Sequence, residues 1–148
     1  MLTRRSLIGL LAATPLLARP AFAATPEVYA DGGFAIRGTD PVAYFRTGGP
    51  ARGSDAHMLM WRGATWAFTS AENMSAFEMD PEAYAPQYGG YCAYAVSQGY
   101  TASTDPDAWT IHEGKLYLNY SISVRSRWER DIPGHIAQAD ANWPGVLS

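Results

Sequence analysis

The sequence has little of what several common classes of protein need. It contains one cysteine, Cys92, and one lysine, Lys115, among 148 residues. A single cysteine excludes an internal disulfide framework and the paired thiols of a Cys-x-x-Cys redox motif. There is also no Gly-x-Ser-x-Gly, no His-Glu-x-x-His and no phosphate-binding loop, which argues against a serine hydrolase, a zinc protease and a nucleotide enzyme.

Basic residues are too few and too scattered for binding to nucleic acid or to an anionic membrane. Residues 1–23 hold three arginines and no acidic residue, so residues 24–148 carry a formal charge of −6, against −3 for the whole chain. Proteins that bind a phosphate backbone do so through clustered lysine and arginine. We therefore expect neither nucleic acid nor a charged lipid surface as a partner.

The N-terminus has the order of features found in secretory signal peptides. Arg4-Arg5 precede an apolar run over 8–17, and the small-x-small triplet 21–23 follows it. A run of about ten apolar residues is too short to span a bilayer, which takes roughly 20. Paired arginines are typical of a twin-arginine signal, and a general secretory signal is the alternative. We predict a signal peptide over 1–23, export to the periplasm or beyond, and no stable membrane insertion afterwards.

The remaining 125 residues, 24–148, suit one domain with one core. Two hairpins are predicted, because a turn signal separates apolar strands at 57–68 and again at 109–120. In the second hairpin, Leu116, Leu118 and Tyr120 are expected on one face, and Tyr117 and Asn119 on the other.

Helices are predicted where a capping residue precedes apolar positions at helical spacing. Asp40-Pro41 begins a short helix to about residue 45, and Ser70 caps a helix over 71–79. Further helices are expected over 81–84, after Ser121 or Ser123, and from the Pro133-Gly134 break to about residue 142. With a first strand over 34–37 and no βαβ alternation, the fold class is α+β: a small single domain of two antiparallel hairpins, short helices and C-terminal helices.

The stretch 86–96 is the least ordinary part of the sequence, because Cys92 follows Gly89-Gly90 among tyrosines. The glycines allow backbone conformations closed to other residues, and either a helix or a close-packed strand follows them. If a helix begins near Tyr91, its positive end favours the Cys92 thiolate, which binds a soft metal or attacks a disulfide. The alternative is a buried thiol that acts as a small apolar residue.

The neighbours of Cys92 and one histidine complete the candidate site. Gly89 and Gly90 would position the backbone, and Tyr88 or Tyr91 would hydrogen-bond to the sulfur. His57 is the second candidate ligand because it lies beside Met58 and Met60. Thiolate, thioether and imidazole are the ligand types that select copper(I). A polar surface histidine beside two core methionines is the alternative.

Short motifs in a fixed order resemble those of the YHS domain, and in particular the exported branch of YHS domain-containing proteins. The resemblance covers roughly residues 33–144. The motifs are Asp40-Pro41-Val42, the aromatic stretch 61–68, Ser70 to Asn73, Phe77, Asp80-Pro81, Tyr84, the stretch 85–93, Gly114 to Tyr120, Ala139-Asp140 and Trp143-Pro144.

The resemblance implies a metal-binding module, since YHS domains occur in copper-transporting ATPases and in some monooxygenases. In those versions cysteines stand where this chain has Ala43, Thr69 and Asn73, and hydroxyl and amide groups are poor copper(I) ligands. Only Cys92 remains as a sulfur ligand of that kind. Some members of the exported branch are described as selenoproteins, which would imply redox or soft-metal chemistry if selenium takes the place of this sulfur.

Three functions follow as hypotheses. The first is a periplasmic module for copper or another soft metal ion, with Cys92 as principal ligand and His57 as the second. The next is a thiol-dependent redox protein in which Cys92 is catalytic and a small redox partner supplies the second thiol. The third is a non-catalytic interaction domain, in which Trp61, Trp66, Trp109 and the tyrosines supply a core or a partner surface.

Overall fold

A four-stranded mixed sheet forms one half of the fold. The computed structural model describes residues 24–148, so the predicted signal peptide lies outside the described residues. The sheet has the order β1-β2-β4-β3, with antiparallel pairs β1–β2 and β3–β4 and a parallel pair β2–β4. Its strands are β1 (Ala30–Asp31), β2 (Phe34–Ala35), β3 (Ser54–Trp61) and β4 (Ala64–Phe68).

Helix α2 (Ala71–Met79) covers one face of this sheet and begins where the sequence predicts. The hydroxyl of Ser70 accepts a hydrogen bond from the Asn73 N–H at 3.1 Å, which satisfies a donor that has no partner within the helix. From this helix Phe77 packs against Trp66 and Phe68, with ring centroids 4.9 and 5.2 Å apart. The other short helices of this half are η1 (Ile36–Gly38), α1 (Ala43–Arg46) and α3 (Pro81–Tyr84).

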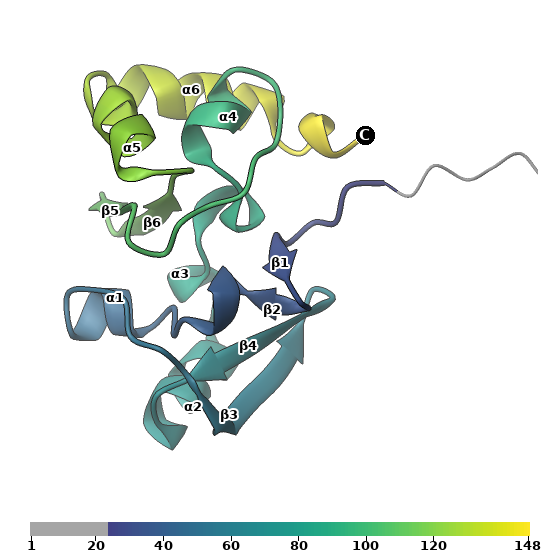
Figure 1. Cartoon of the computed structure of the whole chain (residues 1–148), viewed down its shortest axis with the longest axis vertical. Helices are drawn as coiled ribbons and strands as arrows, with labels where there is room; N and C mark the ends of the chain where they lie inside the picture. The colour runs from purple at the N-terminus through teal and green to yellow at the C-terminus, as the bar shows by residue number, and fades with distance from the viewer. Residues whose placement is uncertain (1–23) are drawn as a thin grey trace, which may run out of the picture.

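The other half consists of a second hairpin and a group of helices (Figure 1). Ser121 caps α5 through the N–H of Val124 at 3.2 Å, one of the two caps expected there. The elements are η2 (Gln87–Gly90), α4 (Ala93–Ser97), β5 (Trp109–His112), β6 (Lys115–Leu118), α5 (Ile122–Glu129), α6 (Ile132–Asn142) and η3 (Gly145–Leu147).

Strand β6 separates two hydrophobic cores. Leu116 and Leu118 point into the core under the four-stranded sheet, whereas Tyr117 between them packs into the core of the helical half against Trp128. Side chains alternate across a strand, so one short strand serves both cores. This confirms the predicted faces of these three residues, and a fully buried leucine contributes roughly 1.5–3 kcal/mol to stability.

The α+β class and the small single domain are confirmed, and two local predictions are wrong. Pro133 and Gly134 do not separate helices but lie in the first turn of α6, because Asp131 caps that helix through the Gly134 N–H at 3.1 Å. The stretch 34–37 is a strand only over Phe34–Ala35, after which η1 follows. Within residues 24–148, no helix combines the length and the apolar character that a bilayer span requires.

Candidate functional site

Cys92 lies immediately before α4 and is buried, with 1% of its surface exposed. Its thiol donates a weak hydrogen bond to Asn119 Oδ1 at 3.5 Å, and its sulfur accepts one from the Tyr120 N–H at 3.3 Å. The same Asn119 oxygen also accepts the Tyr94 N–H at 3.0 Å. The sulfur is therefore held by polar groups of the chain inside the helical half.

Burial raises the pKa of the Cys92 thiol above its ordinary value, although backbone N–H groups of Ala95, Tyr120 and Tyr94 act in the lowering direction. Desolvation disfavours the charged thiolate, and here it exceeds the stabilisation from those donors. Helix α4 has only five residues, so its dipole adds little to the stabilisation of the thiolate by those donors. The sulfur is thus a neutral thiol near neutral pH, which differs from the thiolate expected from its place before a helix.

We expect Cys92 to react slowly with iodoacetamide in the native protein, by a factor of roughly ten or more relative to the unfolded chain. Low thiolate content and burial both slow the reaction, and the rate should rise with pH. Mass spectrometry of the alkylated fraction over time measures it. The control is Ser75→Cys in a Cys92→Ser background, because Ser75 is exposed on α2. Equal rates for the two cysteines would contradict the neutral, enclosed thiol.

The residues around Cys92 do not fit a copper(I) site. A small pocket of about 290 Å³ adjoins the sulfur, and its other lining side chains are Tyr94, Tyr100, Tyr120, Val124, Arg127 and two alanines. None of them is an imidazole or a thioether, the donors that would complete such a site. Among residues 24–148, no group of three or more histidine, cysteine or carboxylate side chains is placed to hold a metal ion.

His57 is not brought to Cys92. It belongs to β3, at the opposite end of the molecule from α4 in Figure 1. Exposure alternates along β3, so that His57 faces the partly covered side while Met58 and Met60 face solvent. The strand geometry therefore also separates the imidazole from the two thioethers that flank it in sequence.

Tyr88 and Tyr91 do not hydrogen-bond to the sulfur as predicted. The Tyr88 hydroxyl donates to Asp140 Oδ1 at 2.8 Å, and the Tyr91 hydroxyl donates to the Pro26 carbonyl at 2.6 Å. Burial, and for Tyr88 also the hydrogen bond to Asp140, raises the pKa of both hydroxyls, so each remains a donor. The hydrogen-bond partners of the Cys92 sulfur are instead Asn119 and Tyr120.

Gly89 and Gly90 form the turn between Tyr88 and Tyr91, with φ of 63° and 82°. Their carbonyls accept hydrogen bonds from the Tyr29 N–H at 2.9 Å and from the Thr104 hydroxyl at 2.7 Å. Of the two glycines, Gly89 also lines a cleft whose lining residues do not include Cys92.

A buried carboxylate occupies the place where the resemblance implies a metal site. Asp40 is fully buried, and its Oδ1 accepts the N–H groups of Val42 and Ala43 at 2.8 and 3.3 Å. Its Oδ2 accepts the N–H and hydroxyl of Thr69 at 2.8 and 2.9 Å and the amide of Asn73 at 2.9 Å. Ala43, Thr69 and Asn73 therefore meet at one carboxylate, which accepts five hydrogen bonds from the chain itself.

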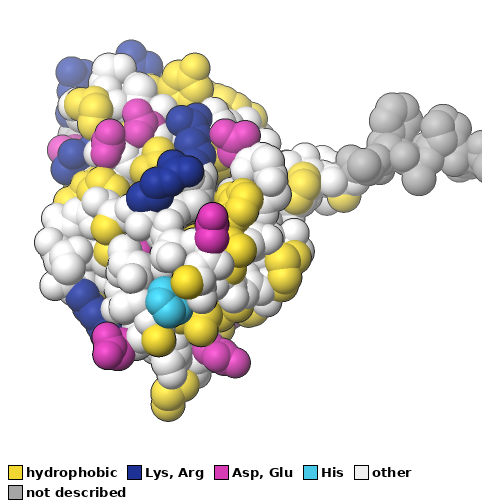
Figure 2. Space-filling model, turned by 60° about the horizontal axis from the view of Figure 1, so that its bottom comes forward, with side chains coloured by type: hydrophobic (Ala, Val, Ile, Leu, Met, Phe, Trp, Pro, Cys, Tyr) yellow, Lys and Arg dark blue, Asp and Glu magenta, His cyan; other side chains and the backbone are white. Residues whose placement is uncertain are grey.

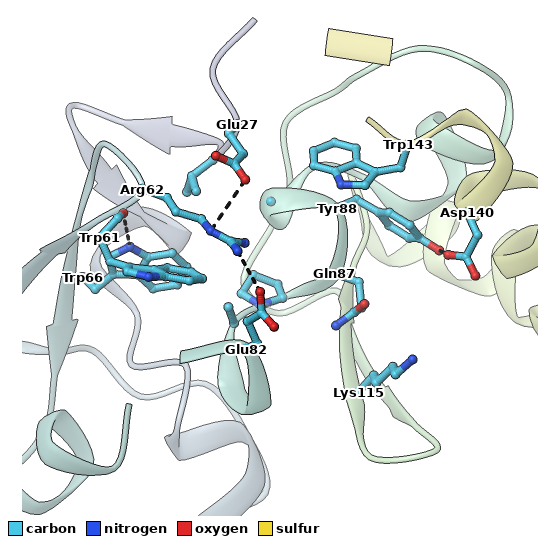
Figure 3. Close-up of a pocket in the computed structure, with 14 residues that line it drawn as sticks. Glu27, Trp61, Arg62, Trp66, Glu82, Gln87, Tyr88, Lys115, Asp140 and Trp143 are labelled. Atoms are coloured by element: carbon cyan, nitrogen blue, oxygen red, sulfur yellow. Dashed lines mark hydrogen bonds and ion pairs between the residues drawn. The ribbon is translucent and has the colours of Figure 1, made fainter. Parts of the chain in front are cut away.

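A cleft of about 500 Å³ lies between the two halves. Figure 3 shows Trp61 and Trp66 on one side and Trp143, Tyr88 and Gln87 on the other, with Arg62 between them. The residues come from five separate parts of the chain. Its polar lining residues are Glu27, Arg62, Glu82, Gln87, Tyr88, Lys115 and Asp140.

Arg62 organises the charges of the cleft. Its guanidinium lies 4.2 Å from the ring centroid of Trp61 and donates to Glu82 at 2.8 Å, with Glu27 at 3.6 Å. Arg62 stands at the tip of the β3–β4 hairpin with φ of 49°, followed by Gly63 with φ of 77°, as a tight hairpin turn requires. The turn therefore places the Arg62 guanidinium over the Trp61 ring and beside the carboxylates of Glu82 and Glu27.

Sequence patterns indicate parts of this cleft but not the cleft itself. Trp61 and Trp66 are among the predicted aromatic partner residues, and Tyr88 and Gly89 among the predicted site residues. Lys115 and Asp140 fall within motifs of the resemblance, but no local signal assigns them to one site with Glu27, because the three become neighbours only when the two halves meet.

The surface shows no concentration of one charge on the face drawn in Figure 2, where acidic and basic side chains are interspersed. Comparison of the chain with family models, curated proteins and solved structures found no match.

Proposed function

We propose that this chain is an exported, non-catalytic binding domain that takes a small polar ligand in the cleft between its two halves. The observation that carries the proposal is the cleft: about 500 Å³, with indole rings and polar groups contributed by both halves. Small-molecule sites are typically concave, of this size, and lined by aromatic side chains with a few placed polar groups.

The cleft side chains favour binding over catalysis. Its lining residues include no histidine, serine, threonine or cysteine, so the usual pairs of nucleophile and base are missing from it. Asp140 accepts the Tyr88 hydroxyl at 2.8 Å and Glu82 accepts Arg62 at 2.8 Å, so two of the carboxylates already have partners. Paired carboxylates serve to orient a ligand more readily than to abstract a proton.

Export and kinship with YHS domains belong to the same proposal and rest on the sequence. The signal features over 1–23 support export, and the ordered motifs support the kinship. The copper function receives no support from the donors around Cys92, since they lack a second soft ligand. Copper analysis of protein exported by its own signal, compared with Cys92→Ser, tests the copper hypothesis independently.

We expect a ligand of this cleft to bind at least roughly tenfold more weakly to Arg62→Ala, because both the cation and the alignment of Glu27 and Glu82 are lost. Calorimetry with a panel of monosaccharides, amino acids, dicarboxylates and polyamines identifies a binder and measures the change. Arg125→Ala is the matched control, since Arg125 forms an ion pair of the same 2.8 Å length with Glu129 on α5, outside the cleft. Equal weakening by the two variants, or no binder in the panel, would contradict the proposed site.

A further inference from the structure

We infer that the ligand of the cleft is an uncharged, polyhydroxylated molecule of the saccharide class. This inference rests on the proposed function and adds the chemistry of the ligand. It follows from the way in which the charged groups of the cleft are already paired, and from the groups that this pairing leaves free.

The strongest charges in the cleft neutralise one another. Arg62 lies between Glu82 at 2.8 Å and Glu27 at 3.6 Å, and Asp140 accepts a hydrogen bond from Tyr88 at 2.8 Å. A charged ligand would have to displace one partner of the Arg62 pairs, whose side chains are 40–74% exposed, and would gain only the small energy of another exposed ion pair. A hydroxyl group can bond to the outer edge of a paired carboxylate without separating the pair.

The place that suits a ligand cation is already filled. The guanidinium of Arg62 lies over the Trp61 ring at 4.2 Å, where a ligand ammonium would otherwise gain a cation–π contact. An incoming cation would meet Arg62 at this position.

An anion is disfavoured for the opposite reason. Three carboxylates, Glu27, Glu82 and Asp140, face two cations in the lining, which gives the five ionic groups a formal charge of −1. Of the two cations in the cleft lining, Arg62 and Lys115, only Arg62 has an ion-pair partner among the described residues. Lys115 is exposed at the rim, where solvent screens its charge.

Hydroxyl groups match what remains. The amide of Gln87 offers both a donor and an acceptor, the carboxylates offer acceptors, and a hydroxyl can fill either role. Trp143 lines the cleft from the opposite side and adds an apolar surface on which C–H groups of a sugar ring can pack. The amide and carboxylate groups beside the Trp143 indole therefore favour a ligand whose ring carries many hydroxyl groups.

Three sugars that share one ring distinguish an uncharged ligand from a cation and an anion. They are glucose, which is uncharged, glucosamine, whose amine is protonated at the mildly acidic pH of the experiment, and glucuronate, which carries a carboxylate. The readout is the indole N–H resonance of Trp143, identified by its loss in Trp143→Phe. We expect glucose to shift this resonance and to bind about tenfold or more tightly than either charged sugar. Gln87→Leu should weaken glucose binding, whereas Gln98→Leu, at an exposed position outside the cleft, should not.

The outcomes are distinguishable. Tighter binding of glucosamine or glucuronate, with the Trp143 resonance shifted, overturns the uncharged class and leaves the cleft as the binding site. A shift produced by an amino acid or a dicarboxylate, but by none of the sugars, does the same. Absence of any shift with all of these probes overturns both this inference and the proposed function.

Discussion

Replacing Asp40 with alanine is expected to lower the free energy of unfolding by about 3–5 kcal/mol. The carboxylate is fully buried and accepts five hydrogen bonds, from Val42, Ala43, Thr69 and Asn73. Alanine would leave these donors without their acceptor, and each buried donor left unsatisfied is costly. Denaturant unfolding followed by tryptophan fluorescence measures the loss.

The effect should come from the loss of a hydrogen-bonding hub, which is the Asp40 carboxylate together with its five donors. Loss of a helix cap alone would have a smaller effect. Asp131→Ala is the matched control, because Asp131 is an exposed cap that accepts a single N–H, that of Gly134, and should cost about 1 kcal/mol. Asp40→Asn separates charge from shape: its amide presents N–H groups toward donors, so it should remain markedly destabilised. A loss for Asp40→Ala no larger than that for Asp131→Ala would contradict the hub.

The same hub explains how this chain differs from what the resemblance implies. The three positions at which the resemblance implies cysteines, Ala43, Thr69 and Asn73, instead surround a carboxylate, and Asn73 also accepts a hydrogen bond from Arg46 at 3.1 Å. A buried anion with a complete set of donors can hold these loops together, as a bound metal would. The sequence shows the loss of the thiols, but the assembly around Asp40 depends on contacts between α1 and α2 that no short motif reveals.

Local signals predicted the elements well where one residue acts within one turn of chain. Ser70 and Ser121 cap the helices assigned to them, and the Arg62-Gly63 turn joins two strands as expected. The predicted helix break at Pro133-Gly134 is wrong, because a proline is also compatible with the first turn of a helix and Asp131 supplies the cap. The parallel pairing of β2 with β4 has no local signal, since it joins segments about 30 residues apart in sequence.

The site was predicted less well, because its chemistry depends on burial and on the meeting of the two halves. The position of Cys92 before a helix favoured a thiolate, but desolvation exceeds the effect of the nearby N–H groups and raises the pKa of the thiol. The sequence predicts Tyr88 and Gly89 as neighbours of the sulfur, whereas in the structure they line the cleft. Proximity in sequence was therefore a poor guide to which site these residues serve.

Replacing Gly89 with alanine should destabilise the protein by roughly 2–4 kcal/mol and weaken ligand binding in the cleft. Gly89 has φ of 63°, and a Cβ there would collide with the carbonyl oxygen of Glu27. That segment cannot easily move away, because the Tyr29 N–H bonds to the Gly89 carbonyl at 2.9 Å and the Tyr91 hydroxyl holds the Pro26 carbonyl at 2.6 Å. Relief of the collision would displace Glu27 from Arg62.

Gly114→Ala provides the matched control for this substitution. Gly114 has φ of 76°, but a Cβ there meets nothing within 4 Å, so the variant carries the backbone strain without the collision. It should lose about 1 kcal/mol and leave the cleft unchanged. Thermal or denaturant unfolding gives the difference between the two variants, and calorimetry with the cleft ligand gives the effect on binding. If both variants lost the same stability, the segment around Glu27 would have to move freely to relieve the collision. The cleft would then lack a fixed position for Glu27, which contradicts the proposed site.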